Sequence, residues 1–408
     1  MASPHLRWRQ SQAASDQLWT RVRPEAMTAR PVPERHRLIF YLGHLEAFDW
    51  NLLAPALELR PFRAEWDQLF AFGIDPLEGA LPSDAASAWP APAEVGAYNR
   101  QVRERLEAAL AAKNGADPAG AQRMAELLEV ALEHRWMHVE TLSYLFHNLD
   151  YEQKLAPALD SASPQQAAPA AGQGSAVRIP AGAVRLGQPR GASFGWDNEF
   201  EAHTVEVDEF AAERYKVTNR DYLAFVEGGA EAPHFWMRHG EQWWLRGMFA
   251  AKPLPLDWPV YVTHHQARAY CGWAGKRLPS EAEWQRMAYA SPAGEERQYP
   301  WGSAAPAEAG PSGWDPMPTQ ARPDGASAWG VEDLIGNGWE WTSSVFAPFP
   351  GFAAFDFYPG YSANFFDGKH YVLKGGSPRT AACLLRRSFR NWFQPNYPYA
   401  YAGFRCIA

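Results

Sequence analysis

The first part of the chain, roughly 150 residues, carries apolar side chains at helical spacing. Apolar residues recur three and four positions apart, which lines one face of an α-helix. Asn114-Gly115 follows one of these patterns as a C-cap. The spacing predicts one shorter helix and three long ones, over residues 10–21, 34–57, 92–114 and 117–149. Four amphipathic helices joined in this way favour a helical bundle.

The pattern changes twice beyond this predicted bundle. Residues 155–177 are mostly Ala, Pro, Gln, Gly and Ser, a composition typical of a linker. After residue 178, short extended segments alternate with loops rich in Gly, Pro and Asn, and helical patterns are few. One of those helices begins after Thr218, a favourable N-cap residue. We therefore expect an α+β chain with a helical bundle at 1–154, a linker at 155–177 and a loop-rich domain at 178–408.

Charge and composition exclude several classes of protein. A net charge of −8 over 408 residues disfavours a nucleic-acid-binding protein, which needs a basic face. The sequence contains no apolar run of about twenty residues, so no membrane span is expected. The N-terminus "MASPHLRWRQ" lacks the apolar core of a signal peptide, and three cysteines make no disulfide framework. We expect a cytoplasmic protein, and its 19 tryptophans suit cores and the walls of ligand pockets.

Three histidines of the predicted bundle are candidate metal ligands. His134 and His138 are four residues apart, so they share one face of their helix. His44 lies in another predicted helix, which can direct it toward that pair. Three imidazoles would leave coordination positions open for substrates, and they suit Zn, Cu, Fe and Ni alike. The spacing alone leaves open the alternative that these histidines simply pack on the helices.

Several phrases of the second half occur in a characteristic order. They are "FGWDNEFEAHTVEVDEF", "WPVYVTHHQARAYCGWAGKRLPSEAEWQRMAY", "GVEDLIGNGWEWTSS" and "RRSFRNWFQPNYPYAYAGFRC". This part resembles the formylglycine-generating-enzyme, or sulfatase-modifying-factor, family, whose loop-rich fold is related to C-type lectins. The first half, with "GHLEAFDW" and the histidine pair, resembles a four-helix DinB-type bundle. The two in this order resemble the ergothioneine-synthase group of non-haem iron enzymes, which includes selenoneine synthases.

The resemblance implies a set of ligands and substrates. In that group three bundle histidines, which match His44, His134 and His138, hold Fe(II). O2 is then the co-substrate, and the reaction is oxidative bond formation at C2 of the imidazole of hercynine. The segment "RNWFQP" matches the part of the family that contacts hercynine, so Asn391 and Trp392 are candidate binding residues. The resemblance places Phe393, Phe349 and Met137 at the same substrate site. The alternative for these two residues is packing within a loop.

The resemblance also implies that the catalytic acid differs here. Many relatives have a tyrosine at the position of Phe349, and a phenyl ring cannot donate a proton. Many relatives also have a glutamine that touches hercynine at the position of Met137, which cannot make that hydrogen bond. A replacement acid could come from a tyrosine near the C-terminus. The candidates are Tyr397, Tyr399 and Tyr401.

Two further differences from the family predict the donor of the chalcogen atom, which is sulfur or selenium. Phe393 and Tyr397 occupy positions at which the family has an Asp and an Arg that bind γ-glutamylcysteine. A donor with carboxylates favours arginine, whereas a neutral sugar favours aromatic walls and hydroxyl groups. The sequence therefore leans toward a selenosugar and selenoneine biosynthesis. The alternative is a thiol donor, γ-glutamylcysteine or cysteine, giving a hercynyl sulfoxide, and Arg100 or Arg103 could still meet a carboxylate.

Other readings of the same residues stay open. The bundle alone would suit a DinB-type thiol transferase with Zn2+ or Ni2+, or a binding module in which the histidines only pack. Formylglycine generation is disfavoured, because it needs a pair of copper-binding cysteines, and Cys271, Cys383 and Cys406 are expected to be packed thiols. The turn near Asn337 could bind a structural Ca2+ or be a tight turn only. We expect small-molecule substrates, and the sequence does not predict the oligomeric state.

Overall fold

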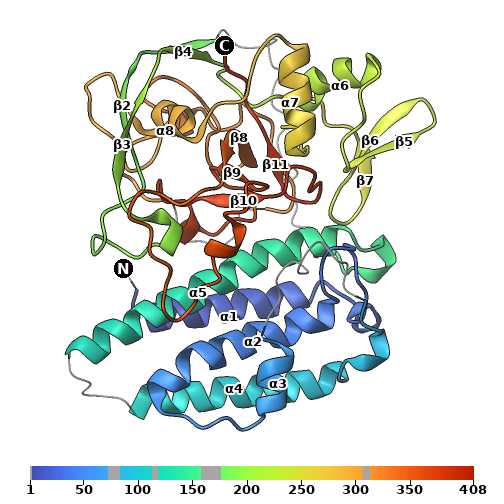
Figure 1. The fold of residues 1–408 in the computed structure, drawn as a ribbon. Coiled ribbons are helices and arrows are strands. Elements are labelled where there is room, and N and C mark those ends of the chain that lie inside the picture. The colour runs from blue at the N-terminus through green and yellow to red at the C-terminus, as the bar shows by residue number, and fades with distance from the viewer. Residues whose placement is uncertain (1, 72–82, 113–117, 158–175, 307–312) are drawn as a thin grey trace. The chain divides into compact units, whose positions relative to one another are not determined.

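The computed structural model describes residues 2–71, 83–112, 118–157, 176–306 and 313–408 (Figure 1). The chain divides into two compact units, Met1–Leu159 and Asp160–Ala408. The predicted C-cap at Asn114-Gly115 and most of the predicted linker lie outside the described residues. Each unit is described by itself below.

The first unit is a helical bundle, as predicted. Its helices are α1 (Pro4–Trp19), α2 (Leu38–Leu53), α3 (Ala64–Leu69), α4 (Pro92–Ala112) and α5 (Pro118–His147). Helix α1 packs on α5, and α2 packs on both α4 and α5 (Figure 1). Most side chains of α2 are buried, which explains why its sequence is apolar nearly all round.

Two features of the bundle differ from the predicted helices. Helix α1 begins at Pro4, well before residue 10, because the Ser3 hydroxyl accepts a hydrogen bond from the Leu6 N–H and proline suits the first helical turn. The short helix α3 was not predicted, since six residues are too few to show a periodic pattern. The four predicted helices are all present, although their bounds differ from those predicted.

The second unit consists of short strands, three helices and long connections. A four-stranded sheet has the order β10-β9-β8-β11, antiparallel except that β11 runs parallel to β8. Its strands are β8 (Trp339–Val345), β9 (Tyr371–Lys374), β10 (Asn391–Phe393) and β11 (Ala402–Gly403). The smaller sheets pair β1 (Val177–Ile179) with β4 (Phe210–Ala212), β2 (Gly182–Leu186) with β3 (His203–Val207), and β6 (Gln242–Arg246) with β5 (Trp236–His239) and β7 (Ala251–Pro253).

Each α-helix described in this unit begins at a side-chain cap. The helices are α6 (Asn219–Glu227), α7 (His264–Trp273) and α8 (Glu281–Tyr289). The hydroxyls of Thr218, Thr263 and Ser280 accept hydrogen bonds from the third residue of these helices. The predicted N-cap at Thr218 is confirmed, and the fold is mixed α+β, as expected.

A buried ion cluster lies at the centre of the second unit. Glu340 of β8 accepts hydrogen bonds from the Lys216 ammonium at 2.6 Å and from the Arg405 guanidinium at 3.0 Å. All three side chains are 0% exposed. Burial raises the pKa of Glu340, but the two cations outweigh burial and hold the pKa below its ordinary value. The cluster ties β8 to Lys216, which lies between β4 and α6, and to Arg405, which follows β11.

The turn before β8 is held by protein atoms. The Asn337 side chain accepts from the Met317 N–H at 2.8 Å and donates to the Met317 carbonyl at 3.0 Å. It also donates to Asp333 at 2.7 Å, and Asp333 adopts the left-handed conformation, with φ of 59°. These bonds support the tight turn, and the suggested Ca2+ site gains no support.

The cysteines are free thiols. Cys271 and Cys406 are buried, with their sulfur atoms 3.1 Å apart, and Cys383 is half-buried.

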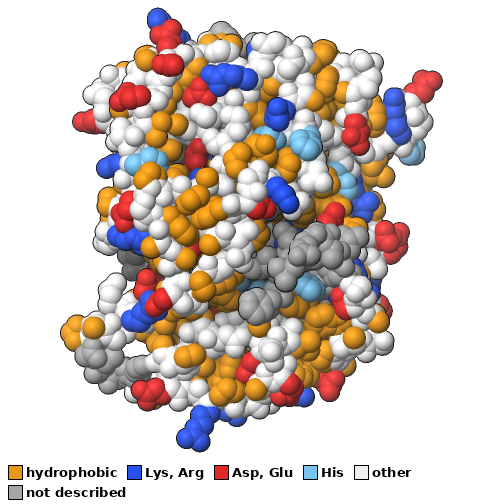
Figure 2. Space-filling view, in the orientation of Figure 1, with side chains coloured by type: hydrophobic (Ala, Val, Ile, Leu, Met, Phe, Trp, Pro, Cys, Tyr) orange, Lys and Arg blue, Asp and Glu red, His pale blue; other side chains and the backbone are white. Residues whose placement is uncertain are grey.

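On the face drawn in Figure 2, Lys and Arg side chains are interspersed with Asp and Glu. Within the described ranges, no helix has both the length and the hydropathy required to cross a bilayer.

Candidate metal centre

The bundle brings three predicted metal ligands together. His44 lies in α2, and His134 and His138 lie one turn apart in α5. Their ligand nitrogens all lie within 4.8 Å of one another. The ring centroids are 5.2 Å apart for His44 and His134, 4.8 Å for His44 and His138, and 4.5 Å for His134 and His138. In the part of the chain that the structure describes, this is the one such group of His, Cys, Asp or Glu side chains.

Burial keeps these three rings neutral. His44 and His134 are 4% and 3% exposed, and His138 is half-buried. Burial lowers the pKa of His44 to about 4. Burial, and then the charges of neighbouring histidines, lowers the pKa of His134 and His138 well below the ordinary value. Neutral imidazole is the form that binds a metal ion, so the group is prepared for ligation at neutral pH.

A backbone carbonyl orients the His44 ring. The Nδ1 atom of His44 donates to the Phe70 carbonyl at 2.7 Å, which leaves Nε2 with its lone pair free to ligate. The Nδ1 atoms of His134 and His138 are buried and have no hydrogen-bond partner among the described residues. Buried polar atoms without partners cost free energy. A metal ion bound by these rings would account for the missing hydrogen-bond partners, so the residues present fit such an ion.

Aromatic side chains enclose the three histidines. Phe48 stacks on His134, with ring centroids 3.4 Å apart and planes 9° from parallel. Phe40 stacks on His44 at 5.0 Å. The Tyr41 ring lies 5.8 Å from His138. These contacts restrict the rotation of each imidazole.

Gly43 and Phe70 support the site and were missed by the sequence analysis. A Cβ atom added at Gly43 would lie 2.7 Å from the Phe70 ring, closer than real Cβ contacts. The glycine therefore allows the Phe70 residue to approach α2 and place its carbonyl against His44. A glycine inside an apolar helical pattern is the signal that could have indicated this close approach.

Replacement of Gly43 by alanine is expected to destabilise the chain by about 1–3 kcal/mol, because the buried Phe70 ring must move. Gly96→Ala is the matched control in α4, where the nearest atom is an Arg100 nitrogen at 3.7 Å. That change should stabilise the helix by about 0.5–1 kcal/mol. Urea unfolding followed by circular dichroism measures both, and a stabilising Gly43→Ala would contradict the packing argument.

The two arginines considered for a donor carboxylate are placed differently. Arg103 donates to Glu46 at 2.6 Å and to both carboxylate oxygens of Asp16, at 2.7 and 2.8 Å. The suggestion that Arg103 awaits a substrate carboxylate is therefore wrong, because two protein carboxylates already occupy its guanidinium. Arg100 is exposed on α4. Met137 is half-buried on α5, between the two ligands of that helix.

The candidate hercynine-binding residues form one edge of the four-stranded sheet. Asn391, Trp392 and Phe393 are the three residues of β10, and all are half-buried. The Asn391 side-chain oxygen accepts from the Trp392 backbone N–H at 2.9 Å. The Trp392 ring stacks on Phe346, with centroids 4.2 Å apart and planes within 8°. The Trp392 ring is thus fixed by stacking, and the Asn391 amide is bonded to the backbone of its own strand.

The three candidate tyrosines fall into two groups. Tyr397 stacks on Phe393 with centroids 4.9 Å apart, and Tyr399 meets the Tyr397 ring edge-on at 5.1 Å. Tyr401 instead packs against Tyr261 at 5.7 Å. The structure thus groups Tyr397 and Tyr399 with β10, whereas the catalytic role of any tyrosine stays a prediction.

Phe349 contacts Arg390 and His203 in this structure, and its place at the substrate stays a prediction. It is buried, and the Arg390 guanidinium lies 3.9 Å from its ring centroid. The His203 ring meets Phe349 edge-on at 4.5 Å. The cation and the imidazole edge fix the ring in place, as expected for a cation on an aromatic face.

The fold and the site together define a class of protein. It has a four-helix bundle with a three-histidine centre, followed by a loop-rich α+β unit. Residues 161–408 match the sulfatase-modifying factor enzyme 1-like domain, and residues 7–142 match the DinB superfamily. The chain belongs to the sulfatase-modifying factor family and carries a DinB-superfamily domain before the family domain.

Curated relatives share different parts of the chain. A hercynine oxygenase of Mycolicibacterium smegmatis is 38% identical over 277 residues, which cover 61% of this chain and 64% of the relative. Ergothioneine biosynthesis protein 1 of Neurospora crassa is 27% identical over 499 aligned residues, which cover 94% of this chain and 55% of the relative. A formylglycine-generating enzyme of Streptomyces coelicolor is 29% identical over 223 residues, which cover 42% of this chain and 69% of the relative. The chain spans less than two thirds of the length of the first two relatives.

Proposed function

We propose that this chain is an iron- and O2-dependent enzyme that joins sulfur to C2 of the imidazole ring of hercynine. The observation that carries the proposal is the buried group of neutral His44, His134 and His138 rings. The similarity to a hercynine oxygenase and to ergothioneine biosynthesis protein 1 supports hercynine as the substrate. The overall reaction converts C2–H, a thiol R–SH and O2 into C2–S(=O)–R and water. The organic substrates lose four electrons, and O2 gains four.

The residues would divide the work as follows. Fe(II) held by the three histidines would supply redox chemistry with O2. The Phe70 carbonyl would keep the His44 proton on Nδ1, away from the ligating nitrogen. Asn391 and Trp392 would bind hercynine, whose trimethylammonium group suits an aromatic face. A phenol of Tyr397 or Tyr399 would donate the proton that Phe349 cannot supply.

The identity of the donor is the finer part of the proposal. The relatives' names concern ergothioneine, so sulfur is favoured over the selenium that the sequence alone suggested. A selenosugar remains the second candidate because of one observation. Phe393 and Tyr397, where charged residues bind γ-glutamylcysteine in the family, form a parallel neutral stack 4.9 Å apart.

The test loads the protein with Fe(II) without oxygen, adds hercynine and one donor, and then admits air. The donors are γ-glutamylcysteine, cysteine and a 1-selenosugar, and products are identified by mass spectrometry. We expect a hercynyl sulfoxide with a thiol, and none when air is withheld or when histidine replaces hercynine. A selenium product alone would favour the second candidate.

Two outcomes would overturn the proposal. One is the absence of any C–S or C–Se product with all three donors. The other is turnover that continues without oxygen in protein that holds Zn2+ or Ni2+. That outcome would favour a DinB-type thiol transferase.

A further inference from the structure

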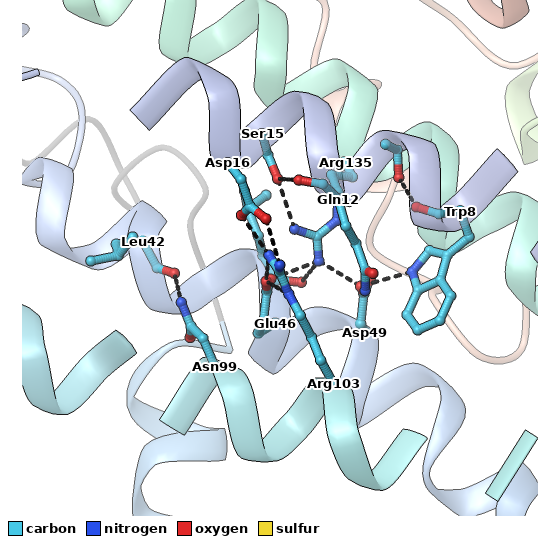
Figure 3. Close-up of polar contacts among 12 residues, drawn as sticks. Trp8, Gln12, Ser15, Asp16, Leu42, Glu46, Asp49, Asn99, Arg103 and Arg135 are labelled. Atoms are coloured by element: carbon cyan, nitrogen blue, oxygen red, sulfur yellow. Dashed lines mark hydrogen bonds and ion pairs between the residues drawn. The ribbon is translucent and has the colours of Figure 1, made fainter. Parts of the chain in front are cut away.

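A buried arginine lies beside the metal ligands without facing them. Arg135 follows His134 in α5, and its side chain is 1% exposed. One of its terminal nitrogens donates to Glu46 at 2.6 Å, to Asp49 at 2.5 Å and to the Leu45 carbonyl at 3.1 Å (Figure 3). All three acceptors belong to α2, the helix that carries His44. The arginine thus connects the two helices that supply the metal ligands.

The cluster around Arg135 includes side chains of all four long helices (Figure 3). From α1, the Ser15 hydroxyl accepts from Arg135 at 3.2 Å, and the Trp8 indole N–H donates to Asp49 at 2.9 Å. From α4, Arg103 donates to Glu46 at 2.6 Å. Both carboxylates of α2 are therefore held from more than one side, which fixes their positions.

Stability alone gives a weak reason for such a cluster. Burying charges is costly, and replacing a buried ion pair with neutral residues of similar volume often leaves stability unchanged or raises it. Apolar side chains of the same size would also hold α2 against α5. What apolar contacts do not supply is a directional constraint, since they permit small shifts of one helix along another.

The position of Arg135 gives the cluster a specific geometric effect. Arg135, which follows the ligand His134, donates to the backbone carbonyl of Leu45, which follows the ligand His44. A slide of one residue along a helix moves a side chain by about 1.5 Å and rotates it by about 100°. Metal ligands must lie within about 0.5 Å of their working positions. A bond between these neighbours restrains both slide and rotation where the ligation is most sensitive to them.

We propose that Arg135 is a positioning residue for the metal centre, which sets the register of α2 against α5 through Glu46, Asp49 and the Leu45 carbonyl. The inference rests on the proposed metal centre and goes beyond it, because it assigns a role to residues that ligate no metal and touch no substrate. It also explains why charged groups are retained in the interior of the bundle.

The test uses Co(II) as the probe and the whole 408-residue chain. The main variant is neutral, Arg135→Met with Glu46→Gln and Asp49→Asn, so that no buried charge of the trio is left uncompensated. We expect it to fold as stably as the parent, yet to bind Co(II) about 10–100-fold more weakly. The visible absorption band of the bound Co(II) should also shift, since the three nitrogens would no longer hold the same arrangement.

Two further variants keep the test decisive. Arg135→Lys preserves the charge but removes the planar guanidinium, in which one nitrogen reaches both carboxylates and the carbonyl while the other donates to Ser15, so it should also weaken Co(II) binding. Arg7→Met is the matched control. Arg7 of α1 donates to Glu129 of α5 at 2.6 Å, a partly buried interhelical pair that does not involve α2. Its loss should change Co(II) affinity by less than about twofold.

The outcomes separate this inference from the metal centre itself. If the parent chain binds no Co(II), or if His134→Ala binds Co(II) as the parent does, the metal centre is wrong. If the parent binds Co(II) but the neutral variant keeps its affinity and absorption band, the positioning role alone is wrong. An equal loss in Arg7→Met would likewise overturn the role, because it would reflect general loosening of the bundle.

Discussion

Alanine at His138 is expected to abolish iron binding and to reduce product formation on the order of a thousandfold. His138 supplies one of three ligand nitrogens that lie within 4.8 Å of one another. The two imidazoles that remain would hold Fe(II) poorly, because no other His, Cys, Asp or Glu of the described residues joins this group to replace the lost nitrogen. The iron content after desalting and the yield of hercynyl product measure the two effects.

The fold should survive this substitution. Burial keeps the half-buried His138 ring neutral, and its Nδ1 atom has no hydrogen-bond partner among the described residues, so its removal leaves no charge and no hydrogen bond unpaired. His264→Ala is the matched control, since His264 is a fully buried histidine of the second unit that stacks on Tyr371 at 3.8 Å. We expect that control to lower stability and to leave the iron content unchanged. Full iron occupancy in His138→Ala would contradict the assignment of the ligands.

The sequence indicated the ligands but not the atoms that hold them. The spacing of His134 and His138 predicts a shared helix face, and that prediction needs no tertiary information. The carbonyl that orients His44 belongs to Phe70, 26 residues away, and a backbone carbonyl has no signature in the sequence. Gly43, inside an apolar helical pattern, is the sequence signal of the close approach of Phe70 to α2.

The charges of the bundle show a second limit of sequence reasoning. On a helical pattern, Arg103 and Arg135 look like solvated positions or substrate ligands. Their carboxylate partner Glu46 lies 57 and 89 residues away, respectively. Which helix faces which determines whether such a charge is paired, and helical periodicity carries no information about that choice.

The second domain was recognised from ordered motifs more than from its secondary structure. Its strands are short, three to seven residues apart from the two-residue β11, so alternation of polar and apolar residues is a weak signal there. The aromatic pairs of Phe393 with Tyr397 and of Trp392 with Phe346 join residues 4 and 46 positions apart. Packing of this kind follows from the loops, whose course the residue pattern does not determine.

Glutamine at Glu340 is expected to destabilise the second unit by about 3–5 kcal/mol at neutral pH. The substitution keeps the shape of the side chain but leaves Lys216 and Arg405, both 0% exposed, as two buried cations without their anion. The indole N–H of Trp284 also donates to the carboxylate at 3.0 Å. Denaturant unfolding of the parent and the variant measures the difference in free energy. The matched control is Glu206→Gln on β3, whose side chain is exposed and whose loss should change stability by less than about 0.5 kcal/mol.

The loss of stability in Glu340→Gln should also depend on pH, and the titration of Lys216 determines whether the loss grows or shrinks as pH rises. Burial lowers the pKa of Lys216 below the ordinary value of 10.5, even though Glu340 counteracts the shift. Without Glu340 the pKa falls further, so between that pKa and 10.5 the unfolded chain binds more protons than the folded chain. Stability of the variant therefore rises with pH in this window, and the deficit against the parent shrinks between the pKa of Lys216 in the variant and its higher pKa in the parent. A deficit that stays constant from pH 7 to 10 would contradict this account, because it would mean that Lys216 keeps its proton without Glu340.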